Sequence, residues 1–348
     1  MPPAELISTA RIAVGDWEED DYVIDPAGHA SRLTGPAPSL AGLLGSSGLT
    51  AIARQYTTHD KAAVEAQRAF KRAAVRANWA VLLAAVFSAL LLMTVPLSAR
   101  LPADAGKGLY IAFGVGGAST GALAGMWLFQ IREGELLKRW LTARARAEAD
   151  RLRYFDAVTA PVAVAPALLS LLQLEYFRRY QFDVQRAFYR RRGADHQRAA
   201  DRALARRAAA AFLATFAAGV GGVLGGAVDA AWVSLAGFGV IATALAGFAA
   251  AQEGINQDRR NAERYGQTLE ALEQLDAQLD AVRELAAGGD GTAVGAFVAQ
   301  VHERLMAEHR QWLEASEAIA KYVGELDAAL AKLRAKPQAE KGSRGPTA

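Results

Sequence analysis

The sequence of 348 residues contains no cysteine, which excludes disulfide bonds, thiolate nucleophiles and cysteine-ligated metals. Its five histidines are scattered and form no HExxH motif. His302 and His309 fall seven residues apart on one helix face, without a third ligand. No glycine cluster leads into a GKS or GKT phosphate-binding sequence. We therefore predict no catalytic residue, no cofactor and no metal, and a protein that is not an enzyme.

Charged side chains are missing from four long apolar runs. Each run is free of Asp, Glu, Lys, Arg and His, and about 20 such residues suffice for a helix to cross a bilayer core. The runs cover residues 79–98, 109–131, 208–228 and 230–252. Four transmembrane helices are predicted. Coupled carriers place ionisable groups at that depth, so their absence argues against an ion-coupled transporter.

The distribution of basic residues predicts the orientation. The first twenty residues lack the basic start and apolar core of a signal peptide, so we expect the first run to direct insertion. Lysine and arginine are dense before residue 79 and over 132–151, and sparse over 99–108. Because they stay on the cytoplasmic side, both termini are predicted to be cytoplasmic. The net charge of +3 is too small to indicate a specific nucleic-acid partner, and the arginines next to the runs indicate anionic lipid headgroups.

Proline and glycine divide the chain into four predicted parts. Residues 1–57 are predicted to be a mostly disordered arm, whose acidic run at 16–21 is interpreted as a solvated tail or, alternatively, as a segment that docks on the basic helices. Pro161 and Pro166 mark a junction near residue 160. The predicted parts are therefore the arm 1–57, a first two-span unit 58–160, a second two-span unit 161–335 and a disordered tail 336–348.

Apolar residues at three- and four-residue intervals predict long helices after the fourth run. One covers residues 257–285, a turn follows at 287–292, and another helix covers 293–332. A tight turn between two such helices predicts an antiparallel, coiled-coil-like hairpin. The predicted fold is thus an all-α integral membrane protein with two hairpins of spans in parallel repeat and long cytoplasmic helices.

Small residues recur four apart within the runs, and such spacing lets helix backbones approach closely in lipid. One interpretation is packing inside a single four-helix bundle; the other is a homo-oligomer with faces that line a pore. Tryptophans near the run ends indicate the aromatic belt of a membrane interface. The helix-packing residues are Gly117, Gly121, Gly125, Ala214, Ala218, Gly222, Gly226, Gly239, Thr243 and Gly247, and the interfacial ones are Trp79, Trp127 and Trp232.

The C-terminal half resembles a known family in short motifs. They are Asn261-Ala262-Glu263-Arg264-Tyr265, Thr268 and Leu272, followed by Phe297, Val301 and Glu308-His309-Arg310-Gln311-Trp312. This pattern resembles the SLATT domains, two-transmembrane domains associated with SMODS and SLOG proteins of nucleotide-signalling defence systems. Ala66-Gln67-Arg68, Phe70-Lys71-Arg72 and Asn78-Trp79 resemble a sister subtype, which makes two fused SLATT-like units over residues 57–325.

The resemblance implies a non-enzymatic effector of the bacterial inner membrane that forms pores or perturbs the membrane when triggered. It implies a homo-oligomer, and a cytoplasmic protein or nucleotide signal as partner. Two alternatives remain at this point. One is a membrane-anchored scaffold that holds the cytoplasmic helices near the bilayer, and the other is a small-molecule transporter or channel.

Overall fold

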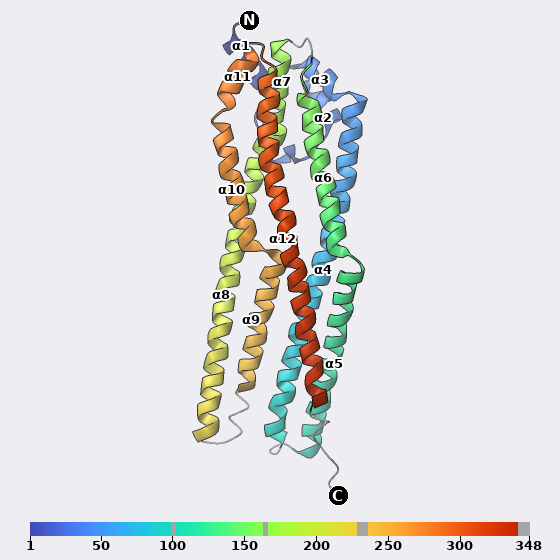
Figure 1. Cartoon of the computed structure of the whole chain (residues 1–348), viewed down its shortest axis with the longest axis vertical. Helices are drawn as coiled ribbons and strands as arrows, with labels where there is room; N and C mark the ends of the chain where they lie inside the picture. Colours follow the sequence, from blue (N-terminus) through green and yellow to red (C-terminus); the bar gives the residue numbers. More distant parts are fainter. Residues whose placement is uncertain (99–101, 163–165, 228–235, 340–348) are drawn as a thin grey trace. The chain divides into compact units, whose positions relative to one another are not determined.

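A computed structural model of the chain is helical throughout the residues that it describes, which are 1–98, 102–162, 166–227 and 236–339 (Figure 1). No strand occurs in these ranges, which confirms the all-α prediction. The elements are α1 (Pro3–Val14), the 3₁₀ helix η1 (Glu19–Tyr22), α2 (Pro26–Leu33), α3 (Pro38–Leu44), α4 (Ser47–Ser98), α5 (Ala103–Glu133), α6 (Leu136–Thr159), α7 (Ala167–Phe177), the π-helical turn η2 (Arg178–Phe182), α8 (Asp183–Ala227), α9 (Ala236–Asn256), α10 (Asp258–Asp276), α11 (Leu279–Ala287) and α12 (Thr292–Ala339).

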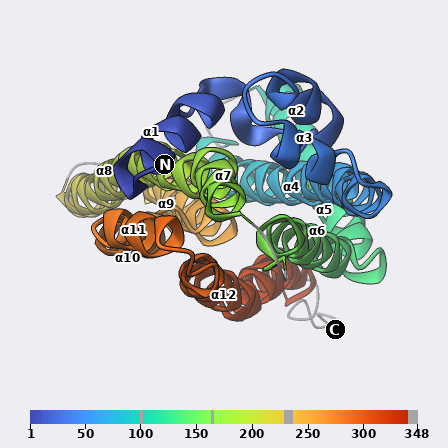
Figure 2. The ribbon, with the colours of Figure 1, turned by 90° about the horizontal axis from the view of Figure 1, so that it is seen from above.

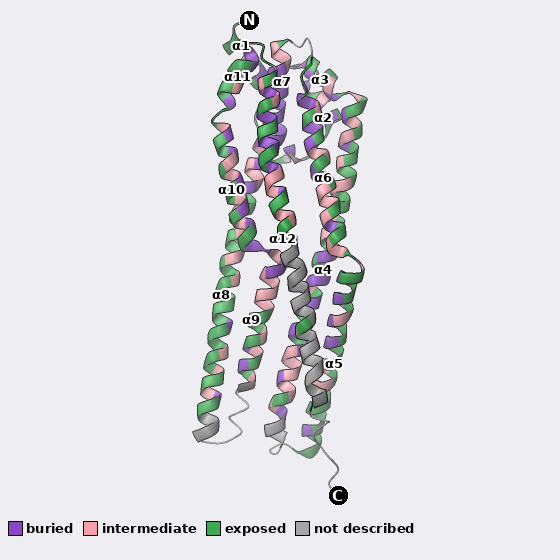
Figure 3. Cartoon of the chain, viewed as in Figure 1, coloured by how far each residue is buried: buried purple, intermediate pink, exposed green. Residues whose placement is uncertain are grey.

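Four of the described helices are long and apolar enough to cross a membrane. They contain the first two predicted runs, on α4 and α5, and the described parts of the other two, on α8 and α9; residues 228 and 230–235 of those runs lie outside the described residues. Large apolar side chains face outward along them, among them Ile111 on α5 and Phe212 and Phe216 on α8, which are 63%, 68% and 60% exposed (Figure 3). Apolar side chains of this kind suit a hydrocarbon solvent. The helix also pairs its backbone N–H and C=O groups internally, which a lipid environment requires.

The chain forms two compact units, each built from three separate segments. The polar unit comprises Met1–Ala66, Lys138–His196 and Arg260–Glu314. The span unit comprises Gln67–Leu137, Gln197–Arg259 and Ala315–Ala348. Each of these compact units draws on both halves of the chain, and the sequential two-span units 58–160 and 161–335 stay a prediction.

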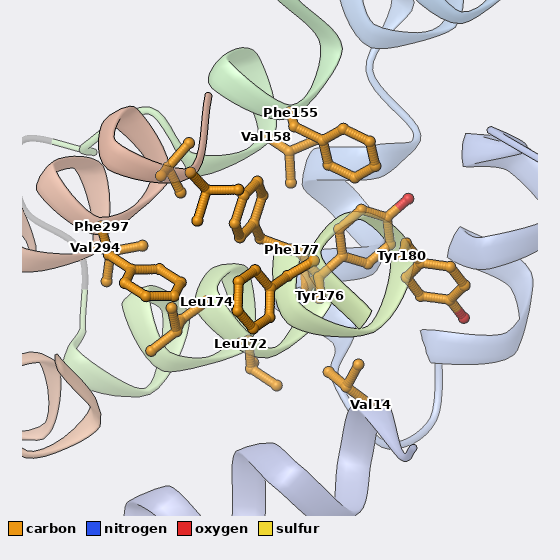
Figure 4. Close-up of a cluster of buried hydrophobic side chains, with 14 of the residues drawn as sticks. Val14, Phe155, Val158, Leu172, Leu174, Tyr176, Phe177, Tyr180, Val294 and Phe297 are labelled. Atoms are coloured by element: carbon orange, nitrogen blue, oxygen red, sulfur yellow. The ribbon is translucent and has the colours of Figure 1, made fainter. Parts of the chain in front are cut away.

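The core of the polar unit is organised around α7. All residues from Ser170 to Phe177 are buried, and burial continues through the five residues of η2. A helix that is apolar on every side is stable only when it is enclosed. The helices α1, α3 and α11 pack against α7 (Figure 2), and Phe155, Phe177 and Phe297 meet edge to face in the resulting cluster (Figure 4).

The N-terminal segment differs from the predicted disordered arm. Residues 1–57 contain α1, η1, α2, α3 and the start of α4, and they bury Ala10, Leu40 and Leu44 completely. Prolines open α1, α2 and α3 in their first turns, where the missing N–H is not needed. Prolines that favoured disorder therefore begin helices, Gly15 and Gly45 end α1 and α3, and alanines and leucines between them supply core contacts.

Local backbone conformations set the helix ends. The junction predicted near residue 160 lies between the end of α6 at Thr159 and the start of α7 at Ala167. The chain breaks between α5 and α6 at Glu135, where φ is 47°. Gln257, with φ of 53°, separates α9 from α10 in the same way. The helices predicted over 257–285 and 293–332 appear as α10, α11 and α12, while the coiled-coil packing stays a prediction and residues 340–348 lie outside the described part of the chain.

Candidate functional site

Small residues bring α8 and α9 close together in the span unit. A β-carbon at Gly239 would lie 3.2 Å from the carbonyl oxygen of Ala214 and 3.5 Å from the Cβ of Ala218. Thr243, one turn further along α9, donates its hydroxyl proton to the Gly239 carbonyl oxygen at 2.8 Å. Three of the predicted small residues thus meet directly, at a separation that leaves little room for a side chain on Gly239.

The remaining small residues divide into packed and open positions. A β-carbon at Gly117 of α5 would lie 3.5 Å from the Cβ of Phe87 on α4, Gly121 is buried, and Gly125 is half-buried. Gly222 and Gly247 face open space, since a β-carbon on either would have nothing within 4 Å. Gly226 lies in α8, but its surroundings and Trp232 fall outside the residues whose contacts are described.

Polar and aromatic side chains gather at one end of the spans. Trp79 is 51% exposed and its ring lies 4.6 Å from that of Phe248. Asn78 is buried and donates to the Phe248 carbonyl oxygen at 3.1 Å. The guanidinium of Arg76 lies 4.7 Å above the ring of Trp127, a cation–π distance. This arrangement suits a membrane interface, the role predicted for Trp79 and Trp127.

Glu175 lies at the centre of a buried ionic cluster in the polar unit. Its two carboxylate oxygens accept from Arg178 Nε and Arg283 Nε, each at 2.6 Å. The two arginines also pair with a second carboxylate each, Asp183 at 2.8 Å and Asp280 at 2.6 Å. Because an unpaired buried charge costs several kcal/mol, this cluster holds α7 to α11 in one arrangement.

The acidic run docks on the neighbouring arginine, which overturns its interpretation as a solvated tail. Arg179 Nε donates to Asp21 at 2.8 Å, and Arg179 Nη1 donates to the Val14 carbonyl oxygen at 2.7 Å. Glu18 adds an ion pair at 3.2 Å. Gly15, with a φ of 77°, makes the turn that aims these groups at one guanidinium. The alternative of a docking segment is therefore the one that the structure supports.

A cavity of 380 Å³ lies within the polar unit. Its volume falls in the range of about 300–1,000 Å³ that is typical of small-molecule sites. Aromatic and charged side chains dominate its lining: Tyr22, Tyr56, Phe155, Tyr180, Phe188, Tyr189, Tyr265 and Trp312, with Asp60, Arg144, Glu148, Arg151 and Glu308.

Three buried nitrogens on the cavity wall have no hydrogen-bond partner within the described part of the chain. They are Gln181 Nε2, Arg151 Nε and His309 Nε2. A buried polar group left unpaired costs about 1–3 kcal/mol. A molecule with acceptor oxygens in the cavity, water included, would satisfy the two groups that must donate, Gln181 and Arg151.

Glu148 is the most strongly paired carboxylate in the cavity. It forms ion pairs with Arg144 and with Arg151, the latter at 2.5 Å. Burial alone would raise the pKa of Glu148, but Arg151 and Arg144 outweigh that effect and lower it. At Glu308 burial prevails and raises the pKa, although Arg264 opposes it from 2.8 Å. Of these two carboxylates in the cavity, Glu148 is therefore firmly ionised and Glu308 holds its proton to higher pH.

The histidines of the polar unit do not form a metal site. His302 Nδ1 lies 2.9 Å from Asp156, and the ring of His309 stacks on Trp312 with centroids 5.7 Å apart. Burial lowers the pKa of both histidines and favours the neutral imidazole at neutral pH. Within the described ranges, no group of three or more His, Asp or Glu side chains is placed to hold a metal ion.

Two charged residues of the polar unit, Arg264 and Glu308, belong to the motifs that resemble the SLATT domains, and they pair at 2.8 Å. For the Glu175 cluster the one available signal is the segment 168–177, which is apolar on nearly every side and contains a single carboxylate, Glu175. Such a segment indicates an enclosed helix, and an enclosed carboxylate requires a cationic partner. The sequence does not reveal that Arg283 would supply it.

Residues 176–312 match the family model of the SMODS and SLOG-associating 2TM effector domain 1. The match includes η2, α8, α9, α10, α11 and the first part of α12, and it confirms the SLATT resemblance of the C-terminal half. It does not extend to the first pair of spans, so the sister unit remains a prediction. Searches of curated proteins and of solved structures found no match to the chain.

Proposed function

We propose that the protein is a non-enzymatic effector of the bacterial inner membrane that perturbs membrane integrity when its polar unit is engaged. The observation that carries this proposal is the match of residues 176–312 to a two-transmembrane effector domain, over a segment that contains two of the four charge-free spans. Defence or nucleotide signalling is the setting that the family description supports.

The four spans are proposed to form two hairpins in parallel repeat. In both halves the helix that leads into the first span is unbroken, as α4 and α8. In both halves the second span ends at a residue with positive φ, Glu135 after α5 and Gln257 after α9. This shared pattern supports a repeat despite the weak residue identity between the halves.

Assembly into a homo-oligomer with a membrane-perturbing face is part of the proposal. Gly222 and Gly247 support it, because they leave open strips on α8 and α9 where a second backbone can approach. Gly239 and Gly117 already contact neighbouring helices and are assigned to packing within one chain.

The cavity of the polar unit is the proposed trigger site. Its unpaired donors on Gln181 and Arg151 support a small ligand that carries acceptor oxygens. We expect Gln181→Leu, which removes one donor without adding volume, to abolish triggered activity. Gln274→Leu on the exposed surface of α10 is the matched control and should retain it. Equal activity of the two variants would exclude the cavity as the trigger site.

Membrane integrity in cells tests the function itself. Induced expression, with and without the products of neighbouring genes, should depolarise the inner membrane and release a small fluorescent dye. The Gln181→Leu variant, expressed to the same level, should do neither. Normal potential and growth at high expression under every combination would contradict the effector proposal.

Cysteine labelling tests the proposed orientation, in which both termini are cytoplasmic. The chain has no native cysteine, so single cysteines give unambiguous signals. Ala103→Cys, at the start of α5, should react with an impermeant maleimide in intact cells. Ala287→Cys, at the end of α11, should react only after lysis. Labelling of residue 287 in intact cells would contradict the proposed cytoplasmic position of the C-terminal part.

A membrane-anchored scaffold is the second candidate function. The polar unit favours it, because that unit has its own aromatic core and ionic cluster, which a partner protein could recognise as a folded body. Replacement of all four spans by unrelated apolar helices separates the two functions. A scaffold would keep its activity after the exchange, whereas an effector would lose it.

A further inference from the structure

A cavity of 540 Å³ lies between α8 and α9 within the span unit. Along α8 it is bordered by residues on one helix face, from Ala199 to Leu213, and along α9 by residues from Ala242 to Asn256. Alanines occupy much of both faces, so the helices leave a gap here. A separate hollow lies beside Ala214 and Ala218, further along the same two helices.

The two ends of this groove differ in chemistry. Arg202 and Arg206 line one end, are exposed, and form no hydrogen bond or ion pair with any described residue. Leu213, Leu245 and Phe248 line the part that extends into the spans. An apolar slot with two unpaired guanidinium groups at its mouth is complementary to an amphiphile with an anionic head.

The acidic and amide groups at the same end have other partners. Glu253 accepts from the backbone N–H of Arg259 at 3.0 Å, and Gln252 accepts from Asn78 at 3.4 Å. Asp258, at the start of α10, and Asn256 also interact elsewhere in the chain. The two guanidinium groups are therefore the charged side chains at the mouth that have no described partner, while Glu253 and Asp258 keep their negative charges there.

The groove fits within one leaflet of a bilayer. Arg206 precedes the third apolar run by two residues, which places it at the depth of lipid headgroups. From Arg206 to Leu213, the last residue of α8 that lines the groove, the helix rises about 10 Å at 1.5 Å per residue. Half of a hydrocarbon core is about 15 Å thick. An acyl chain whose phosphate binds at Arg206 would thus pass Leu213 and stay within the same leaflet.

We propose that this groove binds one anionic phospholipid, with its phosphate on Arg202 and Arg206 and an acyl chain between α8 and α9. The proposal rests on the membrane location of the spans and is independent of the trigger and of pore formation. Bound lipid fills the space that the alanines leave and joins the two helices of the matched effector domain.

Native mass spectrometry of the full chain in mild detergent tests the proposal, with phosphatidylglycerol, phosphatidylethanolamine and glycerol 3-phosphate as probes. Phosphatidylglycerol should bind at one site, and the double variant Arg202→Gln/Arg206→Gln should lose about thirtyfold in affinity, since the two arginines contribute about 1 kcal/mol each. Arg192→Gln/Arg207→Gln removes the same charge from α8 outside the groove and should bind as the wild type does.

A second pair of variants tests the slot. Ala209→Phe fills the groove and should displace the lipid, whereas Ala208→Phe, which lies outside it, should not. Both positions are exposed, so neither change disturbs a buried contact. The proposal would be overturned if the two arginine double variants had equal effects on affinity, or if phosphatidylethanolamine bound as well as phosphatidylglycerol did. It would also be overturned if glycerol 3-phosphate bound by itself, or if Ala209→Phe left lipid binding unchanged.

Discussion

Replacement of Glu175 by glutamine should destabilise the polar unit strongly, although the side-chain volume hardly changes. Glu175 is 1% exposed and neutralises both Arg178 and Arg283. Removal of one partner from a buried ion pair costs about 3–5 kcal/mol. Each arginine keeps a second carboxylate, so we expect a loss near the lower limit, about 3 kcal/mol. That loss corresponds to a roughly hundredfold increase in the population of the opened state.

Hydrogen exchange of the full chain in detergent measures this effect on α7 directly. Amides of the buried segment Ser170–Phe177 should exchange roughly a hundredfold faster in Glu175→Gln, as opening becomes easier. Glu273→Gln is the matched control, because the Glu273–Arg190 pair has similar geometry at 3.0 Å but is largely exposed. Exposed pairs contribute about 0–1 kcal/mol. If both variants changed the exchange of α7 equally, burial would not be what makes the Glu175 cluster stabilising.

Three further predictions concern other parts of the chain. Asp21→Asn should lower the free energy of unfolding by about 2 kcal/mol, because it leaves the buried Arg179 without its main partner, and the loss should appear as faster exchange in α1. Burial lowers the pKa of His29 to about 4 from 6.5, so the stability that the neutral ring contributes is complete above pH 6.5 and is lost as the pH falls towards 4; His29→Gln should flatten the pH dependence of the melting temperature in that window. Gly239→Leu should disrupt the contact between α8 and α9 and lower the melting temperature, whereas Gly247→Leu, which faces open space, should keep the fold and weaken only the proposed homo-oligomer, as measured by size-exclusion chromatography.

The spans were predictable because their signal is local. Length and the absence of charge are properties of each run by itself, and they located segments on α4, α5, α8 and α9. The helix breaks at Glu135 and Gln257 were not predictable, because neither residue type favours positive φ as glycine does. The small residues that meet at Gly239 could be recognised by spacing, but spacing alone does not distinguish them from the open positions at Gly222 and Gly247.

The polar unit was harder to predict because its contacts join distant segments. In the sequence, Leu171, Leu174 and Phe177 recur at three-residue intervals, which by itself predicts one buried face, yet α7 is buried on all sides, including Glu175. The helices α1, α2 and α3 are short and rich in proline and glycine, so their local sequence favours disorder. Their stability comes from burial against α7, which is a tertiary effect that overrides local preference.

The discontinuity of the polar unit has a consequence for synthesis. His29 and Tyr176, which share a hydrogen bond, are separated by 147 residues, and Glu175 and Arg283 by a further 108. When the first segment leaves the ribosome, its buried partners have not yet been translated, and two pairs of apolar runs must emerge before the last of them. The N-terminal helices therefore lack their packing partners while the spans are synthesised and inserted into the membrane. The last segment of the polar unit is translated after all four spans. The polar unit can therefore complete its folding only after every span has been synthesised and made available for membrane insertion.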